Sequence, residues 1–188
     1  MAQVFIQPSY GTPEARRHWA DTLAHAVPFR EAALECAALD FAALDPEDRA
    51  RLDALHPDGR ARFWGATAKH DKRMDGVTTG DVALLTGRKH VLAIGEVGHS
   101  FRDPAFARRL WRPDPAKCLW SNVYSFRRYW PVHIPYEEIW ALPGFSAGDN
   151  FMGLRFISPE KAAVVLAHTA ADRRSAPAKD DEICPAVV

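Results

Sequence analysis

The sequence GDVALLTGRKHVLAIGEV, residues 80–97, decides the fold class of this protein. Two runs of apolar and β-branched residues, at 81–85 and 90–97, flank the short segment TGRK at 86–89. Apolar runs of this length on either side of a short segment with a glycine are typical of a β-hairpin. The stretch therefore predicts a β-sheet at the centre of the protein.

Further strands are expected on both sides of this hairpin. Residues 62–67 form a short aromatic run, and residues 122–129 alternate Val123 with Ser125. Alternation with a period of two residues is the pattern of a strand. The opening AQVFIQP, residues 2–8, can add another short strand to the same sheet.

Helices are expected around the sheet. Thr12, Asp45, Asp103 and Ser158 each precede a proline. This arrangement places a side-chain acceptor at the N-cap and proline at the first helical position. In the first helix, apolar residues recur every four positions as far as residue 27. The expected helices cover residues 12–27, 31–39, 45–56, 103–111, 135–142 and 158–166.

These elements predict an α+β fold in three parts. The connections between strands are too short or irregular for successive βαβ units, so we expect a curved mixed sheet or small open barrel with helices packed outside. Residues 1–60 are interpreted as a mainly helical N-terminal extension and residues 61–168 as the sheet domain. Residues 169–188 are small, charged and proline-bearing, which is typical of a flexible linker in a longer protein.

Composition points to a globular protein of the cytoplasm. With 188 residues, of which 47% are hydrophobic, the chain can bury one good core. It has no long apolar run, and its start lacks the features of a signal peptide, so no membrane partner is expected. Cys36, Cys118 and Cys184 are scattered and form no CxxC pair, which favours free thiols in a reducing compartment.

The net charge of zero hides a division along the chain. Residues 31–60 contain eight acidic and three basic residues, a balance of −5, whereas residues 86–130 contain nine basic and three acidic residues, a balance of +6. A polyanion responds to the charge within a Debye length of about 8 Å, not to the total. The basic half can therefore bind nucleic acid although the whole chain is neutral.

Motifs for catalysis are missing from the sequence. The eight histidines have no HxxxH, HExxH or HxH spacing, and there is no GxSxG, Walker loop or GxGxxG. We therefore expect no catalytic site, no metal and no cofactor. His99, beside Ser100 and three residues after Glu96, is the one candidate for chemistry, and a surface polar role fits it better.

The tryptophans and the arginines favour binding instead. Trp64, Trp111 and Trp120 lie at the ends of predicted elements, where an indole can face a cleft and stack on a flat ring, although a core role fits each one equally well. Trp19, Trp130 and Trp140 are expected to pack structurally. Guanidinium groups suit phosphate, and the candidate phosphate-binding residues are Arg102, Arg108, Arg109, Arg112, Lys117, Arg127 and Arg128.

In order and spacing, six segments of the chain are similar to one known family. They are FWGAT at 63–67, GDVALL at 80–85, AIGEV at 93–97, FARRLW at 106–111, WSNVY at 120–124 and residues 144–153, which begin GF and end DNFMG. From residue 61 to 166, the chain resembles the EVE and YTH-like group of the PUA superfamily. The resemblance is greatest to the modified-base-reading modules of modification-dependent restriction systems of the McrB and HNH kinds.

This resemblance implies a domain that extrudes a nucleotide and holds its base in an aromatic pocket. By position, Trp111 matches a cage tryptophan of YTH domains, Asp149 an acid that contacts the base edge, and Thr67 a polar position at the end of the first strand. The second cage tryptophan of that family has no aromatic equivalent between Gly65 and Phe101, so Trp64 or Trp120 has to complete the cage. Asp149 and its neighbour Asn150 are the expected edge readers.

We therefore expect a specificity module that binds double-stranded DNA with a modified, methylated base. Its nuclease would lie in another domain or subunit. The alternatives are an RNA-binding module of the same fold, a small hydrolytic or glycosylase-like enzyme that uses His99, Glu96 or Asp149, and a protein-interaction domain whose basic helix binds an acidic partner.

Overall fold

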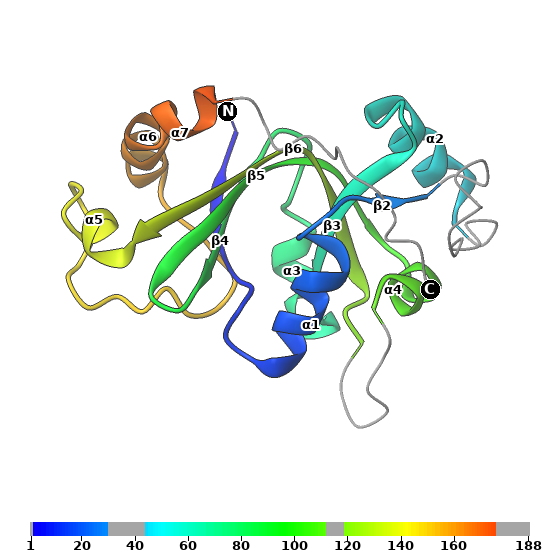
Figure 1. Cartoon of the computed structure of the whole chain (residues 1–188), viewed down its shortest axis with the longest axis horizontal. Coiled ribbons are helices and arrows are strands. Elements are labelled where there is room, and N and C mark those ends of the chain that lie inside the picture. The colour runs from blue at the N-terminus through cyan, green and yellow to red at the C-terminus, as the bar shows by residue number, and fades with distance from the viewer. Residues whose placement is uncertain (1, 30–43, 112–118, 176–188) are drawn as a thin grey trace, which may run out of the picture.

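A computed structural model describes residues 2–29, 44–111 and 119–175 of the chain. In this part, seven strands form one sheet in the order β2-β3-β6-β5-β4-β1-β7 (Figure 1). The strands are β1 Val4–Pro8, β2 Val27–Pro28, β3 Arg60–Ala66, β4 Val82–Gly87, β5 His90–Arg102, β6 Asn122–Pro135 and β7 Arg155–Phe156. The sheet is open, with β2 and β7 at its two edges.

The sheet is mixed, as expected. β1 runs parallel to β4, and every other neighbouring pair is antiparallel. β5 and β6 are much longer than the sequence predicted, and three register shifts interrupt their pairing. Bulges of this kind bend and twist a strand pair, which accounts for the strong curvature in Figure 1. The α+β class and the curved mixed sheet are confirmed, and the sheet does not close into a barrel.

The hairpin of β4 and β5 is confirmed. Gly87 pairs with His90, so Arg88 and Lys89 alone form the turn. Both have positive φ angles, 49° and 62°, as a tight two-residue turn between twisted strands requires. The guanidinium of Arg88 lies over the ring of Tyr10, with its carbon 4.8 Å from the ring centroid, and so contacts the segment after β1.

The four predicted helix starts are also confirmed. The side chains of Thr12, Asp45, Asp103 and Ser158 each accept a backbone N–H of the following turn. The helices are α1 Pro13–Thr22, α2 Pro46–Leu55, α3 Asp71–Met74, α4 Pro104–Leu110, α5 Tyr136–Trp140, α6 Pro159–His168 and α7 Ala170–Arg174, and Ala68–His70 forms a 3-10 turn. The helix expected at 31–39 lies outside the described residues.

Two boundaries differ from the expectation. α1 ends at Thr22 instead of residue 27, and Val27 pairs with Ala61 of β3 instead. Pro28 disfavours a helical conformation of Val27 itself. At the other end, residues 170–174 are helical, although a linker was expected from 169. Thr169 contributes to this, since its hydroxyl donates to the carbonyl of Val165 at the junction of α6 and α7.

The first 22 residues contribute strand β1 to the sheet and helix α1 to the layer of helices packed on it. β1 lies between β4 and β7, and α1 packs on β3. Apolar side chains explain this position, because Val4, Phe5 and Ile6 are fully buried. Strand β1 and helix α1 both precede residue 60, where the sequence placed the start of the sheet domain. Both nevertheless pack with strands that follow residue 60.

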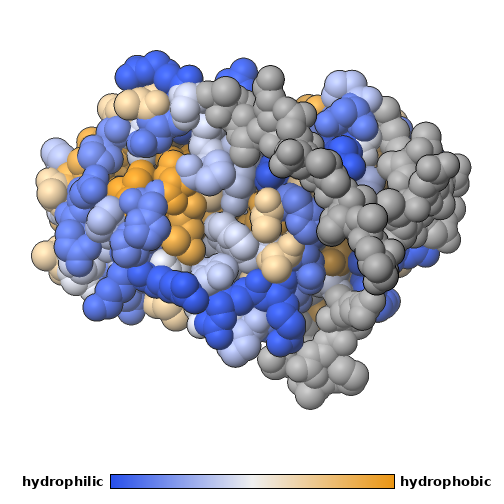
Figure 2. All heavy atoms as spheres, viewed as in Figure 1, coloured by the Kyte–Doolittle hydropathy of each residue, from blue (hydrophilic) through white to orange (hydrophobic). Residues whose placement is uncertain are grey.

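Helices cover both faces of the sheet. α1 and α3 lie on one face, where Phe5, Trp64 and Tyr124 are buried (Figure 1). On the other face, α5 and α6 cover one end of the sheet, and α2 and α4 cover the other end. Figure 2 shows apolar side chains gathered on the side of α5 and α6, with polar residues around them.

Candidate nucleic-acid interface

Three indole rings meet between β3, the end of α4 and the start of β6. Trp64 and Trp120 are perpendicular, with ring centroids 5.1 Å apart and planes at 88°. Trp111 lies 6.4 Å from Trp64 and 5.9 Å from Trp120, at 79° and 57°. We call these three residues the indole cluster. The structure thus brings together the three tryptophans that the sequence singled out.

Local structure holds Trp111 firmly in this cluster. Its backbone N–H donates to the carbonyl of Ala107 at the end of α4, and its Nε1 donates to the hydroxyl of Thr22 at 3.1 Å. The ring also rests on Gly65 of β3, where a Cβ would come within 3.0 Å of its Cη2. A larger residue at position 65 would therefore displace the ring.

The three rings differ in exposure. Trp64 is 0% and Trp111 1% exposed, whereas Trp120 is half-buried. In this conformation neither Trp64 nor Trp111 has a face open to solvent. The Nε1 of Trp64 is buried and has no hydrogen-bond partner among the described residues. A buried donor without a partner costs about 1–3 kcal/mol, so this position is unfavourable unless another group reaches it.

Thr67 directly follows β3, three residues after Trp64. It is half-buried, and its carbonyl accepts the side-chain amide of Asn122 at 3.2 Å. The same amide donates to the carbonyl of Ala66 and to Asp71. Asn122 therefore ties the turn after β3 to β6 beside the indole cluster.

Asp149 and Asn150 lie elsewhere. They follow α5, which is at the opposite end of the sheet from α4 (Figure 1). One oxygen of Asp149 pairs with Arg155 and the other accepts the N–H of Phe151, while its carbonyl accepts Nε1 of Trp140. Burial by itself would raise the pKa of Asp149, but the hydrogen bonds from Arg155 and Phe151 outweigh it and lower the pKa. The structure does not bring this pair to the indole cluster.

The predicted phosphate-binding residues occupy several surfaces. Arg102 is paired with Asp75 at 2.8 Å and also donates to Asn122, and Arg127 is paired with Glu96. Arg108 is exposed on α4. Arg112 and Lys117 lie outside the described residues.

A groove of about 550 Å³ runs between α1 and α4, next to the indole cluster. Two arginines, Arg17 and Arg109, line it together with one acid, Asp21, and with the imidazole of His25. His18 forms part of its wall as well. An anionic backbone would meet a positive surface here.

A second hollow, of about 390 Å³, lies where the turn after α2 meets β3 and β6. Its lining includes Arg60, Arg62, Arg127 and Arg128. Several of these arginines have structural partners: Arg60 donates to the carbonyl of Ala26, and Arg62 to that of Leu23. Arg128 is 62% exposed and 4.0 Å from Glu96, so it is the one most available to an outside anion.

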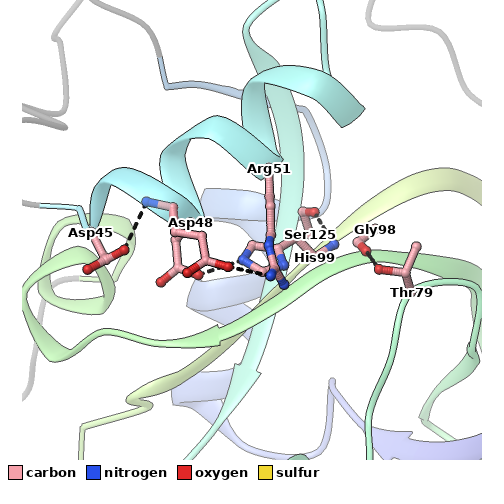
Figure 3. Close-up of polar contacts among 8 residues, drawn as sticks. Asp45, Asp48, Arg51, Thr79, Gly98, His99 and Ser125 are labelled. Carbon is pink, nitrogen blue, oxygen red and sulfur yellow. Dashed lines mark hydrogen bonds and ion pairs between the residues drawn. The ribbon is translucent and has the colours of Figure 1, made fainter.

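His99, the central residue of the enzyme alternative, was expected at the surface but is buried and tied into the fold. His99 is 5% exposed, and its Nε2 lies 2.7 Å from Asp48 of α2 (Figure 3). Ser125 is fully buried, accepts the backbone N–H of His99, and lies 3.0 Å from Nε2 of His56. A buried serine between two histidines cannot reach a substrate. The arrangement therefore fastens α2 to β5 and β6.

His56 gives this buried network a pH dependence. Burial lowers its pKa below 6.5, and Asp58 acts weakly in the opposite direction. The unfolded chain therefore takes up a proton at a higher pH than the folded one. We expect the free energy of unfolding to have its highest value, as far as His56 is concerned, above about pH 6.5. It should decrease as the pH falls below this value.

Urea unfolding at about pH 7.5 and pH 5.5 measures this decrease. His56→Gln keeps a polar group beside Ser125 but cannot titrate, so we expect a smaller decrease in that variant. An equal decrease in the variant and the wild type would assign the acid sensitivity to other groups.

Metal and membrane sites do not appear in the part of the chain that the structure describes. No group of three or more histidine, cysteine or acidic side chains there could hold a metal ion. No helix among these residues is long and apolar enough to cross a membrane.

Comparison with known proteins gives one informative likeness. No protein-family model matches the chain, and no curated protein matches it. Among solved structures, it is similar to the N-terminal domain of Thermococcus gammatolerans McrB bound to m5C DNA, with a TM-score of 0.63 at 16% identity. The two share a fold.

The extent of this shared fold clarifies the domain organisation. The likeness covers 90% of this chain and 98% of the McrB domain. Residues 61–168 are only 108 of 188 residues, so the shared fold includes residues outside that range. The resemblance to the McrB kind of module that the sequence indicated is confirmed at the level of the fold.

Two residues of the site were missed by sequence reasoning. His18 and Thr22 of α1 both contact the indole cluster, and neither belongs to a motif. Their spacing of four residues places them on one face of α1, which was a usable signal. Which strand that face would meet depends on the packing of α1 on β3.

Proposed function

We propose that this protein is a DNA-binding module that reads a modified base in an aromatic pocket built on the indole cluster. The observation that carries the proposal is the convergence of Trp64, Trp111 and Trp120 beside a basic groove. The fold likeness supports it, because the similar McrB domain is bound to m5C DNA. A cytosine with a 5-methyl group is therefore the first base to test.

In such a site, the free energy lost in extruding the base is offset by stacking and by contacts to the phosphate backbone. Extruding a base from a duplex costs a few kcal/mol, and stacking it on an aromatic ring returns about 1–3 kcal/mol. Contacts to the phosphate backbone supply the rest of the affinity. Trp120, the half-buried ring, is the wall that a base would meet first, and the Nε1 of Trp64 is a donor available to the base edge.

Asp149 and Asn150 would read the base edge only if their loop moved to the indole cluster. The Nε1 of Trp64 belongs to the cluster, and Thr67 follows Trp64 by three residues and is bonded to Asn122. Our proposal therefore gives the edge contact to these two groups first.

A panel of labelled duplexes tests the function directly. Each duplex carries one 5-methylcytosine, one N6-methyladenine or no modification, and fluorescence anisotropy is measured at one fixed salt concentration. We expect preference for a modified duplex over the plain one. Equal affinity for all duplexes would contradict base reading, and stronger competition by the matching RNA would assign the pocket to RNA.

Arg108, which is exposed on α4 and does not line the groove, should supply affinity without selectivity. We expect Arg108→Ala on α4 to weaken binding of modified and plain duplexes by the same factor and to reduce the salt slope by about one. The slope comes from titrations at several salt concentrations. Arg51→Ala on α2 is the control, because this arginine is exposed and paired with Glu47. A selective effect of Arg108→Ala on the modified duplex would show that it contacts the base instead.

The nuclease of this proposed system lies outside these 188 residues. Plasmid DNA carrying the preferred modification should stay intact after long incubation with the protein and Mg²⁺. Cleavage of the DNA, or release of the base, would favour the enzyme alternative.

A further inference from the structure

One side chain occupies the space beside the indole cluster. The imidazole of His18 is stacked on Trp111, with centroids 5.3 Å apart and planes at 27°. It is also perpendicular to Trp120 at 4.5 Å. One parallel wall and one perpendicular wall are what an aromatic pocket offers to a flat heterocyclic guest. In this structure the guest is the protein's own imidazole.

His18 also lies between the indole cluster and the basic groove. Among the described residues, the groove is lined by His18 and by none of the three indoles. The imidazole is 5% exposed. A base that approached Trp111 from this groove would therefore meet His18 first.

Hydrogen bonds hold both α1, which carries His18, and Trp111, on which its imidazole is stacked. The N-cap Thr12 begins α1, and near its end the hydroxyl of Thr22 lies 2.7 Å from the carbonyl of Phe63 and accepts Nε1 of Trp111. The hydroxyl of Thr22 therefore connects α1 to Trp111. Rotation of the His18 side chain opens the space above Trp111 without moving α1, because only its χ angles have to change.

We propose that His18 occupies the place of the base in the unbound protein and that a base must displace it to enter. This inference rests on the proposed function and names the residue that sets its selectivity. The apparent affinity for any base is reduced by the population of the closed state. Bases that stack weakly cannot displace the imidazole, whereas a base whose modification adds stacking surface can.

Substitutions at His18 should change affinity and stability in opposite directions. We expect His18→Ala to bind a 5-methylcytosine duplex about tenfold more tightly, from the loss of two aromatic contacts, and to melt at a lower temperature. We expect His18→Phe to bind more weakly and to melt at a higher temperature, because its larger ring stays in the cluster. His168→Ala, exposed on α6 and away from the groove, is the matched control and should do neither.

The outcomes separate this inference from the proposed function. If His18→Ala binds as the wild type does, or more weakly, while Trp120→Ala loses selectivity, then His18 does not block the pocket and the reader function stands. If no duplex is preferred, the reader function fails, and a second measurement still tests the blocking role. Imidazole added to His18→Gly should raise its melting temperature and change its tryptophan fluorescence. No difference from His168→Gly, which removes an imidazole exposed on α6, would overturn the inference.

Discussion

Replacement of Trp120 by alanine is expected to weaken binding of a 5-methylcytosine duplex by about five- to 150-fold. The estimate comes from the loss of about 1–3 kcal/mol of stacking on one base. Trp120 is the ring of the indole cluster that is only half-buried, so it can contact a base with the least rearrangement. Fluorescence anisotropy with modified and plain duplexes measures the effect, and the plain duplex should lose much less affinity.

Trp140→Ala is the matched control for this experiment. Trp140 is also half-buried, but it lies on α5 and donates to the carbonyl of Asp149, away from the indole cluster. The Trp140→Ala substitution should leave the affinity for the modified duplex nearly unchanged. If both variants weaken binding equally, the base is not held at the indole cluster. The role expected for Asp149 and Asn150 from the sequence would then become the better hypothesis.

Gly65→Ala is expected to destabilise the fold by about 3 kcal/mol and to lower the melting temperature by roughly 6–12 °C. A Cβ at position 65 would lie 2.2 Å from the backbone oxygen of Asn122 and 3.0 Å from the ring of Trp111. The oxygen belongs to the pairing of β3 with β6 and cannot move alone. The variant should therefore lose both strand pairing and the position of Trp111. Thermal unfolding followed by circular dichroism measures the change.

Gly11→Ala controls for the loss of a glycine. No atom lies within 4 Å of a Cβ at position 11. The melting temperature of the Gly11→Ala variant should therefore stay within a few degrees of the wild type. Wild-type stability of Gly65→Ala would show that β3 and β6 can separate at this point. In that case Trp111 would also be free to move, and the buried state of the cluster would be easy to open.

The arginines show why a binding surface is hard to predict from charge along the chain. The segment 86–130 is strongly basic, but Arg102 meets Asp75 and Arg127 meets Glu96. Asp75 is 27 residues from Arg102, and Glu96 is 31 residues from Arg127. Such pairs depend on which strands become neighbours, and this cannot be read from the order of residues. Among the predicted phosphate-binding residues that the structure describes, Arg108 on α4 and Arg128 on β6 are exposed and remain candidates for phosphate contact.

Local chemistry is what the sequence determined by itself. Three features form between residues close in the chain: the N-caps before proline, the tight hairpin turn and the period-two alternation. Their hydrogen bonds and steric limits can therefore be predicted from the sequence. These features were sufficient for the α+β class and for the family likeness that the McrB comparison supports. The prediction for the end of α1 was wrong because Val27 pairs with Ala61 of β3, a partner 34 residues away that the local pattern does not show.

Tertiary structure alone decided which side chains share a site. It placed β1 parallel to β4, joined Trp64 to Trp111 and Trp120, and set His18 against two of these rings. It also left Asp149 at the other end of the sheet, paired with Arg155. The physical reason is that side chains distant in sequence meet only through sheet pairing and helix packing. These depend on the burial of the whole apolar surface at once.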